Sequence, residues 1–256
     1  MTNRKCIAVS DVHLGTEHSN RSKFIDFLDN LGDDVDHLVL LGDMLDFWRR
    51  DPVGVLLENI DVIRKLVSLE PEINVSYVLG NHDFHLIQFP KSYFNSVFDL
   101  NYDLSLRYGE TTYRFIHGYQ LECARFGTLE AYELFANEMC EAGDDVGRVA
   151  DAVWKSVCEG GKIIDRIRNL LIGRPNWVSE MVGETVAPPD KRDLKKLEGY
   201  AAQLITGTYA GEFLIYGHTH EPFVKMEENI ANTGSWVEGS TDYLEIDAEG
   251  VTLKSY

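Results

Sequence analysis

Short apolar runs alternate with helical patterns over the N-terminal third of the chain. Residues 4–10, 37–41 and 73–79 are mainly apolar and have the length of buried strands. Between them, apolar residues recur at helical spacing in residues 22–31 and again after Asp51-Pro52, a pair typical of a helix start. In this second helix the predicted apolar stripe consists of Leu56, Leu57, Ile60, Ile63 and Val67. The alternation predicts an α/β architecture.

The remaining strand patterns indicate a second sheet. Residues 102–108 and 111–117 alternate in polarity and are separated by Gly109-Glu110, which predicts a hairpin. Further strands are expected at residues 213–216, 223–226, 230–237, 243–246 and 251–256.

Residues 119–210 have a different pattern, in which apolar residues repeat at helical spacing. Four such stripes begin at Leu129, Val149, Ile163 and Leu194. We therefore expect residues 1–118 and 211–256 to form one core and residues 119–210 to form a helical insertion. The stripes predict a small core within the insertion. An apolar face that meets lipid, a partner subunit or a long substrate tail is the alternative.

Composition narrows the range of functions. Of the 256 residues, 42 are Asp or Glu and 24 are Lys or Arg, so the formal charge is −18. Such a surplus of negative charge argues against a surface that binds nucleic acid or anionic lipid. No apolar stretch is long enough to span a membrane, and the run after Arg4-Lys5 is too short for a signal peptide. We therefore expect a cytoplasmic protein whose four scattered cysteines are reduced.

Histidines cluster with acidic residues and glycines directly after the predicted strands. Five of the eight histidines have this placement: His13, His82, His117, His218 and His220. In Asp11-Val12-His13 and His218-Thr219-His220 the two candidate ligands are two residues apart, so they point to the same side of an extended segment. Nitrogen and oxygen ligands without thiolate favour a divalent ion such as manganese, iron, zinc or nickel.

Five short blocks, in order along the chain, resemble the motif set of the calcineurin-like metallophosphoesterase superfamily. The blocks are Asp11-Val12-His13, Gly42-Asp43-Met44-Leu45-Asp46, Gly80-Asn81-His82-Asp83, His117-Gly118 and Gly217-His218-Thr219-His220. The resemblance implies a β-sandwich flanked by helices, with the helical insertion between the fourth and fifth blocks. It also implies a site for two divalent metal ions. Manganese is our first expectation, and iron, zinc and nickel are alternatives.

The resemblance also implies a role for each of these residues. Asp11, His13, Asp43 and His220 match the ligands of the first metal. Asp43 matches the bridging ligand, and Asn81, His117 and His218 complete the second site. His82 matches the catalytic histidine near the leaving group, and Asp46 matches the aspartate that orients it. The implied activity is hydrolysis of a phosphomonoester, phosphodiester or pyrophosphate bond by a metal-activated hydroxide.

Within the superfamily, the layout is similar to the UDP-2,3-diacylglucosamine hydrolase branch, which cleaves a nucleotide-sugar pyrophosphate in lipid assembly. Shared features are Phe47-Trp48 after the second block, the helical insertion and the run Asn232-Thr233-Gly234-Ser235-Trp236. That branch commonly has arginine at the position of His82, so the acylated sugar nucleotide is one alternative among several phosphate compounds.

Other residues are candidates for binding a small or lipid-linked phosphate substrate. They are Trp48, Arg49, Arg50, His85 and Arg125. An arginine can bind phosphate through two parallel hydrogen bonds, although a solvated charge on a helix face is the plainer interpretation. Two other functions remain as alternatives: a non-catalytic metal-binding scaffold, and a nuclease, which the negative charge disfavours. Peripheral contact of the insertion with a membrane surface is a further alternative.

Overall fold

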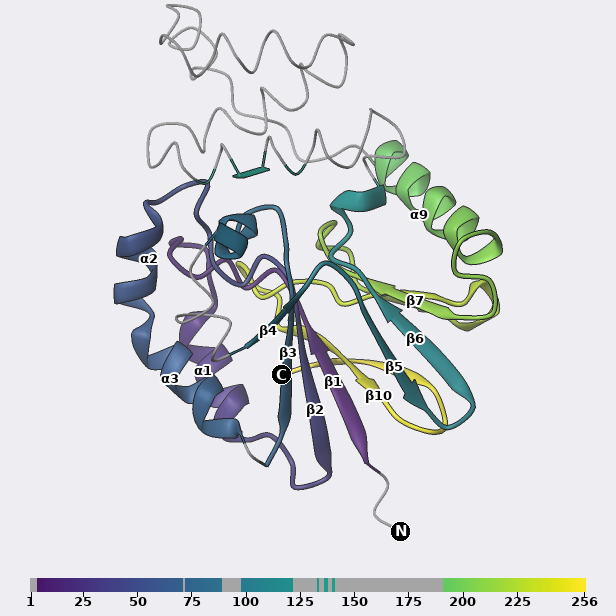
Figure 1. Cartoon of the computed structure of the whole chain (residues 1–256), viewed down its shortest axis with the longest axis horizontal. Helices are drawn as coiled ribbons and strands as arrows, with labels where there is room; N and C mark the ends of the chain where they lie inside the picture. The colour runs from purple at the N-terminus through teal and green to yellow at the C-terminus, as the bar shows by residue number, and fades with distance from the viewer. Residues whose placement is uncertain are drawn as a thin grey trace, which may run out of the picture.

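The structure is a computed structural model that describes residues 4–70, 72–88, 98–121, 133, 136, 137, 140 and 191–256. Of residues 191–197 and 202 only the backbone is described. Two mixed sheets face each other across a shared apolar layer, and helices cover their outer faces (Figure 1). This layered arrangement confirms the fold class predicted from the sequence.

The first sheet has the strand order β11-β10-β1-β2-β3-β4. Its central strands β1 (Lys5–Val9), β2 (Val35–Leu41) and β3 (Asn74–Val78) are parallel to one another. The outer strands are β4 (Asp99–Asn101), parallel to β3, and β10 (Asp242–Ile246) and β11 (Val251–Ser255), each antiparallel to its inner neighbour. Because β1, β2 and β3 run in one direction, their carboxyl ends meet at the same edge.

The second sheet has the strand order β5-β6-β7-β9-β8. The predicted hairpin is confirmed as β5 (Leu104–Tyr108) and β6 (Thr111–Phe115). The other strands are β7 (Phe213–Tyr216), β8 (Phe223–Lys225) and β9 (Ile230–Asn232). Since β7 is parallel to β6 and to β9, the carboxyl ends of these three strands also come together.

Helices pack on the outer face of each sheet (Figure 1). Those of the first sheet are α1 (Arg21–Asp29), α2 (Pro52–Glu58) and α3 (Ile60–Leu69), and that of the second is α9 (Lys191–Thr206). Two short 3-10 helices, η1 (Phe84–Gln88) and η3 (Met226–Glu228), lie in connections. None of the helices in the described ranges has the length and apolar character needed to cross a bilayer.

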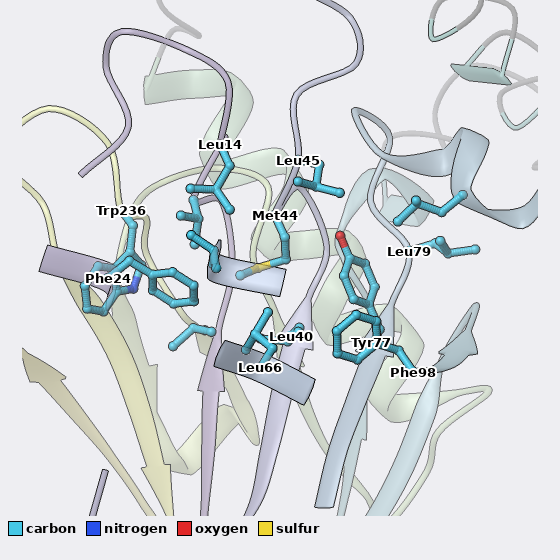
Figure 2. Close-up of a cluster of buried hydrophobic side chains, with 14 of the residues drawn as sticks. Leu14, Phe24, Leu40, Met44, Leu45, Leu66, Tyr77, Leu79, Phe98 and Trp236 are labelled. Carbon is cyan, nitrogen blue, oxygen red and sulfur yellow. The ribbon is translucent and has the colours of Figure 1, made fainter. Parts of the chain in front are cut away.

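The core is layered because the strands alternate in the direction of their side chains. Ile7 and Val9 of β1 point to the helices, whereas Cys6 and Ala8 of the same strand point to the second sheet. Figure 2 shows part of the first layer, where Phe24, Leu66 and Trp236 lie in one cluster with side chains of the central strands. On the far side, Ala201 and Ile205 of α9 pack against β7. Ala201, Leu204 and Ile205 of the stripe predicted to begin at Leu194 therefore contact the second sheet. The other three stripes lie outside the described residues.

The predicted strand over residues 230–237 is shorter in the structure, because β9 ends at Asn232. Gly234 has a φ of 77°, which a strand does not allow. Its N–H donates to Asn232 Oδ1 at 2.9 Å, and the Trp236 N–H donates to the carbonyl of Asp11 at 3.0 Å. This segment is thus a loop that holds the segment following β1.

The apolar stripe predicted for the second helix is wrong in part. Leu57, Ile60 and Val67 are 68%, 43% and 39% exposed, although all three were assigned to the buried face. The buried face instead carries Val55, Asn59, Val62 and Leu66. Asn59 lies between the end of α2 and the start of α3. It can be buried because its side-chain amide donates a hydrogen bond to Val55 O and accepts one from Arg21 Nε. A polar residue on the inner face therefore misled the hydrophobic pattern.

Two leucines of this helix pair test the assignment of its faces. Leu66→Ala removes a side chain that is 4% exposed, and we expect it to lower the free energy of unfolding by about 2–5 kcal/mol. Leu57→Ala removes one that is 68% exposed and should change the same quantity by less than about 0.5 kcal/mol. Denaturant unfolding measures both. Equal losses would mean that the face assignment is incorrect.

Candidate metal centre

The candidate ligands follow the carboxyl ends of five strands, at the edge where the two sheets meet. Asp11 and His13 come after β1, Asp43 after β2, and Asn81 and His82 after β3. From the second sheet, His117 follows β6, and His218 and His220 follow β7. The structure thus brings together six of the seven residues that the sequence assigned to metals, and Asn81 follows the neighbouring strand β3.

Most of these ligands have a strained backbone. Asp11, His13, Asp43, His218 and His220 have φ between 49° and 68°, the left-handed region that residues with a Cβ avoid. Among the described residues only two other non-glycine residues, Asn229 and Glu238, have positive φ. Each such residue costs roughly 1–3 kcal/mol, and such strain concentrates at functional sites. Here it turns side chains from separate strands toward one another.

Two glycines allow the ligand loops to touch. A Cβ on Gly80 would lie 2.1 Å from Asp43 Oδ1 and 2.3 Å from Asp43 N. A Cβ on Gly217 would lie 2.6 Å from Asp11 Oδ2. Neither position has room for any other residue, so glycine is needed there for close approach rather than for flexibility.

The first group of candidate ligands is Asp11, His13 and His220. His220 Nε2 lies 3.2 Å from Asp11 Oδ1 and 3.3 Å from His13 Nε2. His13 Nε2 also lies 4.0 Å from Asp43 Oδ2. Asp11 Oδ1, His13 Nε2 and His220 Nε2 are therefore close enough together to bind one cation, and Asp43 Oδ2 lies near them.

The second group is Asp43, His117 and His218. His117 Nε2 lies 3.2 Å from Asp43 Oδ2, while its Nδ1 bonds the carbonyl of Leu41 at 2.8 Å. A carbonyl on Nδ1 fixes the proton there and leaves Nε2 as the ligand atom. The ring of His218 lies 5.1 Å from that of His117, between ring centroids. Because Asp43 Oδ2 faces His117 and also His13, this oxygen lies between the two groups.

Unpartnered buried atoms support a fit to metal ions. Asp11 Oδ1, Asn81 Oδ1 and His117 Nε2 are buried and accept or donate no hydrogen bond within the described part of the chain. A buried polar atom without a partner is costly, and atoms reserved for a ligand are a common exception. The donors are carboxylate and amide oxygens and imidazole nitrogens, without thiolate. These residues therefore fit two hard or borderline divalent ions.

The second oxygen of Asp11 stabilises the fold. Asp11 Oδ2 accepts hydrogen bonds from the Ser10 hydroxyl and from the His218 N–H, the latter at 2.9 Å. The Ser10 hydroxyl also lies 2.6 Å from Thr233 Oγ1, from the loop after β9. One oxygen of this carboxylate is thus held by three strand ends, and the other is left toward the candidate metal. Nothing in the sequence indicates this role for Ser10 or Thr233, because it depends on residues far away in the chain.

Asp83 was part of the third block but was given no role, and it connects two ligand loops. It is completely buried, and its carboxylate accepts hydrogen bonds from Tyr77 OH at 2.6 Å, Met44 N at 2.8 Å and Gly80 N at 2.8 Å. Burial, together with the nearby charge of Asp43, raises the pKa of Asp83 to about 6. Asp83 therefore fixes the spacing of the loops that carry Asp43 and Asn81.

His82 and Asp46 lie beside the metal groups. Asp46 Oδ1 is 3.1 Å from His82 Nδ1, and Asp46 Oδ2 is 3.0 Å from His13 Nδ1. Asp46 also accepts from Arg49, whose Nη1 lies 2.6 Å from Oδ2. The backbone of His82 is fixed as well, since its N–H donates to Asp43 Oδ1 at 2.8 Å and its carbonyl accepts from Phe47 N at 3.0 Å.

The proposed substrate residues have other contacts in the structure. Trp48 is 2% exposed, and its ring stacks on His82 with centroids 4.4 Å apart. Arg49 pairs with Asp46, and Arg50 pairs with Glu58 and donates to the carbonyl of Gly15. His85 lies 3.0 Å from Asn137 Oδ1, through Nδ1. Arg125 lies outside the described residues.

The pKa values of the candidate ligands are shifted because several charged groups are buried close together. Burial lowers the pKa of His13, but its interactions with Asp11 and Asp46 outweigh burial and raise the pKa to about 10. Burial also lowers the pKa of His117, and the charge of Asp43 outweighs it and raises the pKa to about 9. Burial raises the pKa of Asp43, but the charges of His117 and His82 hold it below its usual value. Both imidazoles are therefore protonated at pH 7 in the metal-free protein, and a bound ion would displace their protons.

Comparison with known proteins agrees with this geometry. The family model described as "Calcineurin-like phosphoesterase" matches residues 4–222. The chain belongs to the calcineurin-like phosphoesterase family. The match confirms the family predicted from the five blocks and the predicted enzyme class, a phosphoric ester hydrolase.

Curated relatives match the phosphoesterase over nearly its whole length. A UDP-2,3-diacylglucosamine hydrolase of Shewanella baltica (strain OS185) is 25% identical over 98% of this chain and 97% of its own. The protein of the same name from Shewanella sp. (strain MR-4) is 27% identical over the same shares. Among solved structures, the phosphoesterase Yfce from E. coli is 15% identical, with a TM-score of 0.45, and the match covers 97% of this chain and 91% of that one.

The raised pKa values of His13 and His117 predict how pH affects the protein after chelation. Both lie above the unfolded value of 6.5, so the charged imidazoles stabilise the fold fully below pH 6.5, and this contribution is lost as pH rises through about 9 to 10. We expect the free energy of unfolding to fall by at least about 1 kcal/mol between pH 7 and pH 10. Urea unfolding of chelator-treated protein measures this slope.

Binding of manganese should show the opposite dependence, because neutral imidazoles are the ligands, and its affinity should rise with pH. His13→Asn should flatten the stability slope, whereas the matched change at the exposed His18 should leave it unchanged. A wild-type stability without pH dependence in this range would contradict the charge arrangement described above.

Proposed function

We propose that the protein is a dinuclear-metal-dependent hydrolase that cleaves a phosphomonoester, phosphodiester or pyrophosphate bond in a small or lipid-linked compound. One observation carries the proposal: two groups of ligand atoms meet at Asp43, and the His82–Asp46 pair lies beside them. A scaffold that had lost catalysis would not need this pair.

The ligands divide between two ions. Asp11, His13, Asp43 and His220 would hold the first, and Asp43, Asn81, His117 and His218 would hold the second. When bound, divalent ions supply activated water and positive charge at the phosphoryl group. The donor set suits manganese first, with iron, zinc and nickel as alternatives. The local charge of the ions, rather than the overall −18, would then attract a phosphate.

His82 would donate a proton to the departing oxygen. Its Nδ1 lies against Asp46, so the proton available to substrate is on Nε2, which lies 4.0 Å from Asp43 Oδ2 and so toward the metal groups. Asp46 orients the imidazole. The stacked ring of Trp48 prevents the imidazole from rotating out of this position.

The substrate of the curated relatives is a second, more specific candidate. Their name states that they act on UDP-2,3-diacylglucosamine, and they match this chain from end to end at 24–27% identity. This observation favours a pyrophosphate-linked lipid precursor among the possible substrates. We propose that the enzyme is cytoplasmic.

Comparison of two leaving groups tests the role of His82. The 4-nitrophenolate leaving group of an aryl phosphate departs without being protonated. The alkoxide leaving group of an unactivated alkyl phosphate needs a proton from an acid. We expect His82→Ala to lower kcat on the alkyl ester by roughly 10²–10⁴-fold, and on the nitrophenyl ester far less. Metal analysis of the variant should still find two bound manganese ions.

Equal losses on both esters would show that His82 does not act as the acid. If the wild-type protein binds two ions but hydrolyses no mono-, di- or pyrophosphate ester, the scaffold alternative replaces the enzymatic one. Cleavage of DNA as the dominant activity would favour a nuclease.

A substitution of Arg49 tests whether this residue binds the substrate or positions Asp46. Since its guanidinium is bonded to Asp46, we expect Arg49→Met to lower kcat about tenfold and to leave KM within about twofold, because Asp46, which orients His82, loses a fixed partner. Arg64→Met, which removes the same charge from the exposed side of α3, is the control and should change neither constant. A rise in KM without a change in kcat would instead make Arg49 a ligand of the substrate phosphate.

A further inference from the structure

Four described residues from the predicted insertion contact the core. Glu133, Ala136, Asn137 and Cys140 are all in helical conformation, and their spacing of three, one and three residues places them on the same side of a helix. Ala136 and Cys140 are completely buried. They belong to the same hydrophobic cluster as Phe84 and Leu86 of η1. We refer to these four residues as the docking face.

The docking face contacts the loop after β3, which carries Asn81 and His82, and the short helix η1 that follows it. Asn137 Oδ1 lies 3.0 Å from His85 Nδ1, three residues after His82. The thiol of Cys140 lies 3.4 Å from the carbonyl oxygen of His82 and 3.7 Å from that of Asn81. At its other end, Glu133 Oε1 lies 3.5 Å from the hydroxyl of Tyr119, which follows the fourth block.

These contacts complete the support of the His82 backbone. On one side, the loop after β2 holds it through Asp43 Oδ1 and Phe47 N. On the other side, the thiol of Cys140 contacts the carbonyl oxygens of both Asn81 and His82. A thiol is a weak hydrogen-bond donor, so it positions these carbonyls by packing more than by bonding. The hydrogen bond between His85 and Asn137 then keeps the thiol in place.

We propose that Asn137 is a positioning residue: through His85 it docks the insertion on the Asn81–His82 backbone, and this docking holds His82 in the orientation needed for proton donation. The proposal rests on the acid role of His82 in the proposed function. It gives the insertion a part in turnover that does not require contact between the docking face and the substrate.

The two buried cysteines of the described chain provide a direct measurement of docking. Cys140 belongs to the docking face and is buried against the core, whereas Cys6 lies in the layer between the two sheets, where we expect exposure only when the whole domain unfolds. The experiment uses the full chain with Cys123→Ser and Cys158→Ser, so that these two thiols remain. Labelling with iodoacetamide, followed by peptide mass spectrometry, gives the rate for each thiol separately.

We expect Asn137→Ala to raise the labelling rate of Cys140 roughly fivefold, which is the loss of one hydrogen bond, and to leave that of Cys6 unchanged. On an unactivated alkyl phosphate ester, kcat should fall at least about threefold at constant KM, with a smaller effect on a 4-nitrophenyl ester. Asn137→Asp keeps the acceptor oxygen for His85 and should restore both values. Asn74→Ala, which removes an exposed amide bonded to the Asp36 carbonyl, is the matched control.

Three results would overturn the proposal. Unchanged labelling of Cys140 in Asn137→Ala would mean that this residue does not hold the docking face. Faster labelling with unchanged kcat would mean that docking occurs without positioning His82. Equal acceleration at Cys6 and Cys140 would mean that Asn137 acts on global stability only.

Failure of the proposed function gives a different pattern. In that case the parent protein hydrolyses no phosphate ester, but the NMR resonance of the His82 Cε1–H still reports the orientation of the ring. A shift of this resonance in Asn137→Ala and its recovery in Asn137→Asp would support positioning without activity. An unchanged resonance would overturn it.

Discussion

The site depends on how two carboxylates divide their oxygens. Asp11 uses Oδ2 to accept from Ser10 and the His218 backbone, and Asp43 uses Oδ1 to accept from the His82 backbone. The remaining oxygen of each faces histidine nitrogens within about 4 Å. Folding therefore orients the ligands before any ion arrives. The left-handed backbone at Asp11 and Asp43 is the conformational cost of this arrangement, and the loop contacts offset it.

The same arrangement explains how a strongly acidic chain can form a site for phosphate. The charge of −18 belongs to the whole molecule, whereas the site has buried carboxylates matched by imidazoles. Without ions, His13 and His117 neutralise these carboxylates as cations, as their raised pKa values show. Divalent ions bound in place of those protons would carry more charge than the protons do, so the loaded site would be positive. Attraction of a phosphate would then depend on metal binding.

The candidate ligands could be chosen from the sequence because they follow strands that the sequence also predicted. Each block stands at a strand end, and parallel strands bring such ends together whatever the rest of the chain does. The residues that support Asp11 could not be predicted from the sequence. Ser10 contacts Thr233, which is 223 positions away, and nothing in either residue indicates the other. The inner face of α2 and α3 was misread because Asn59 satisfies its amide locally and can be buried. Periodicity records polarity, not whether a polar group has a partner.

Asp46 shows why the acid and the metals form one unit. Its two oxygens contact His82 and His13, so the carboxylate that orients the proposed acid also orients a proposed ligand of the first ion. Substituting Asp46 would therefore disturb metal binding and proton transfer together, and its kinetics would not separate them. His82 forms a third group with His13 and Asp46, but it belongs to neither the Asp11 group nor the Asp43 group, so His82→Ala would remove the proposed acid and keep the ligands of those two groups. The roles within this centre can be separated only at residues that contact one partner, and Asp46 contacts both.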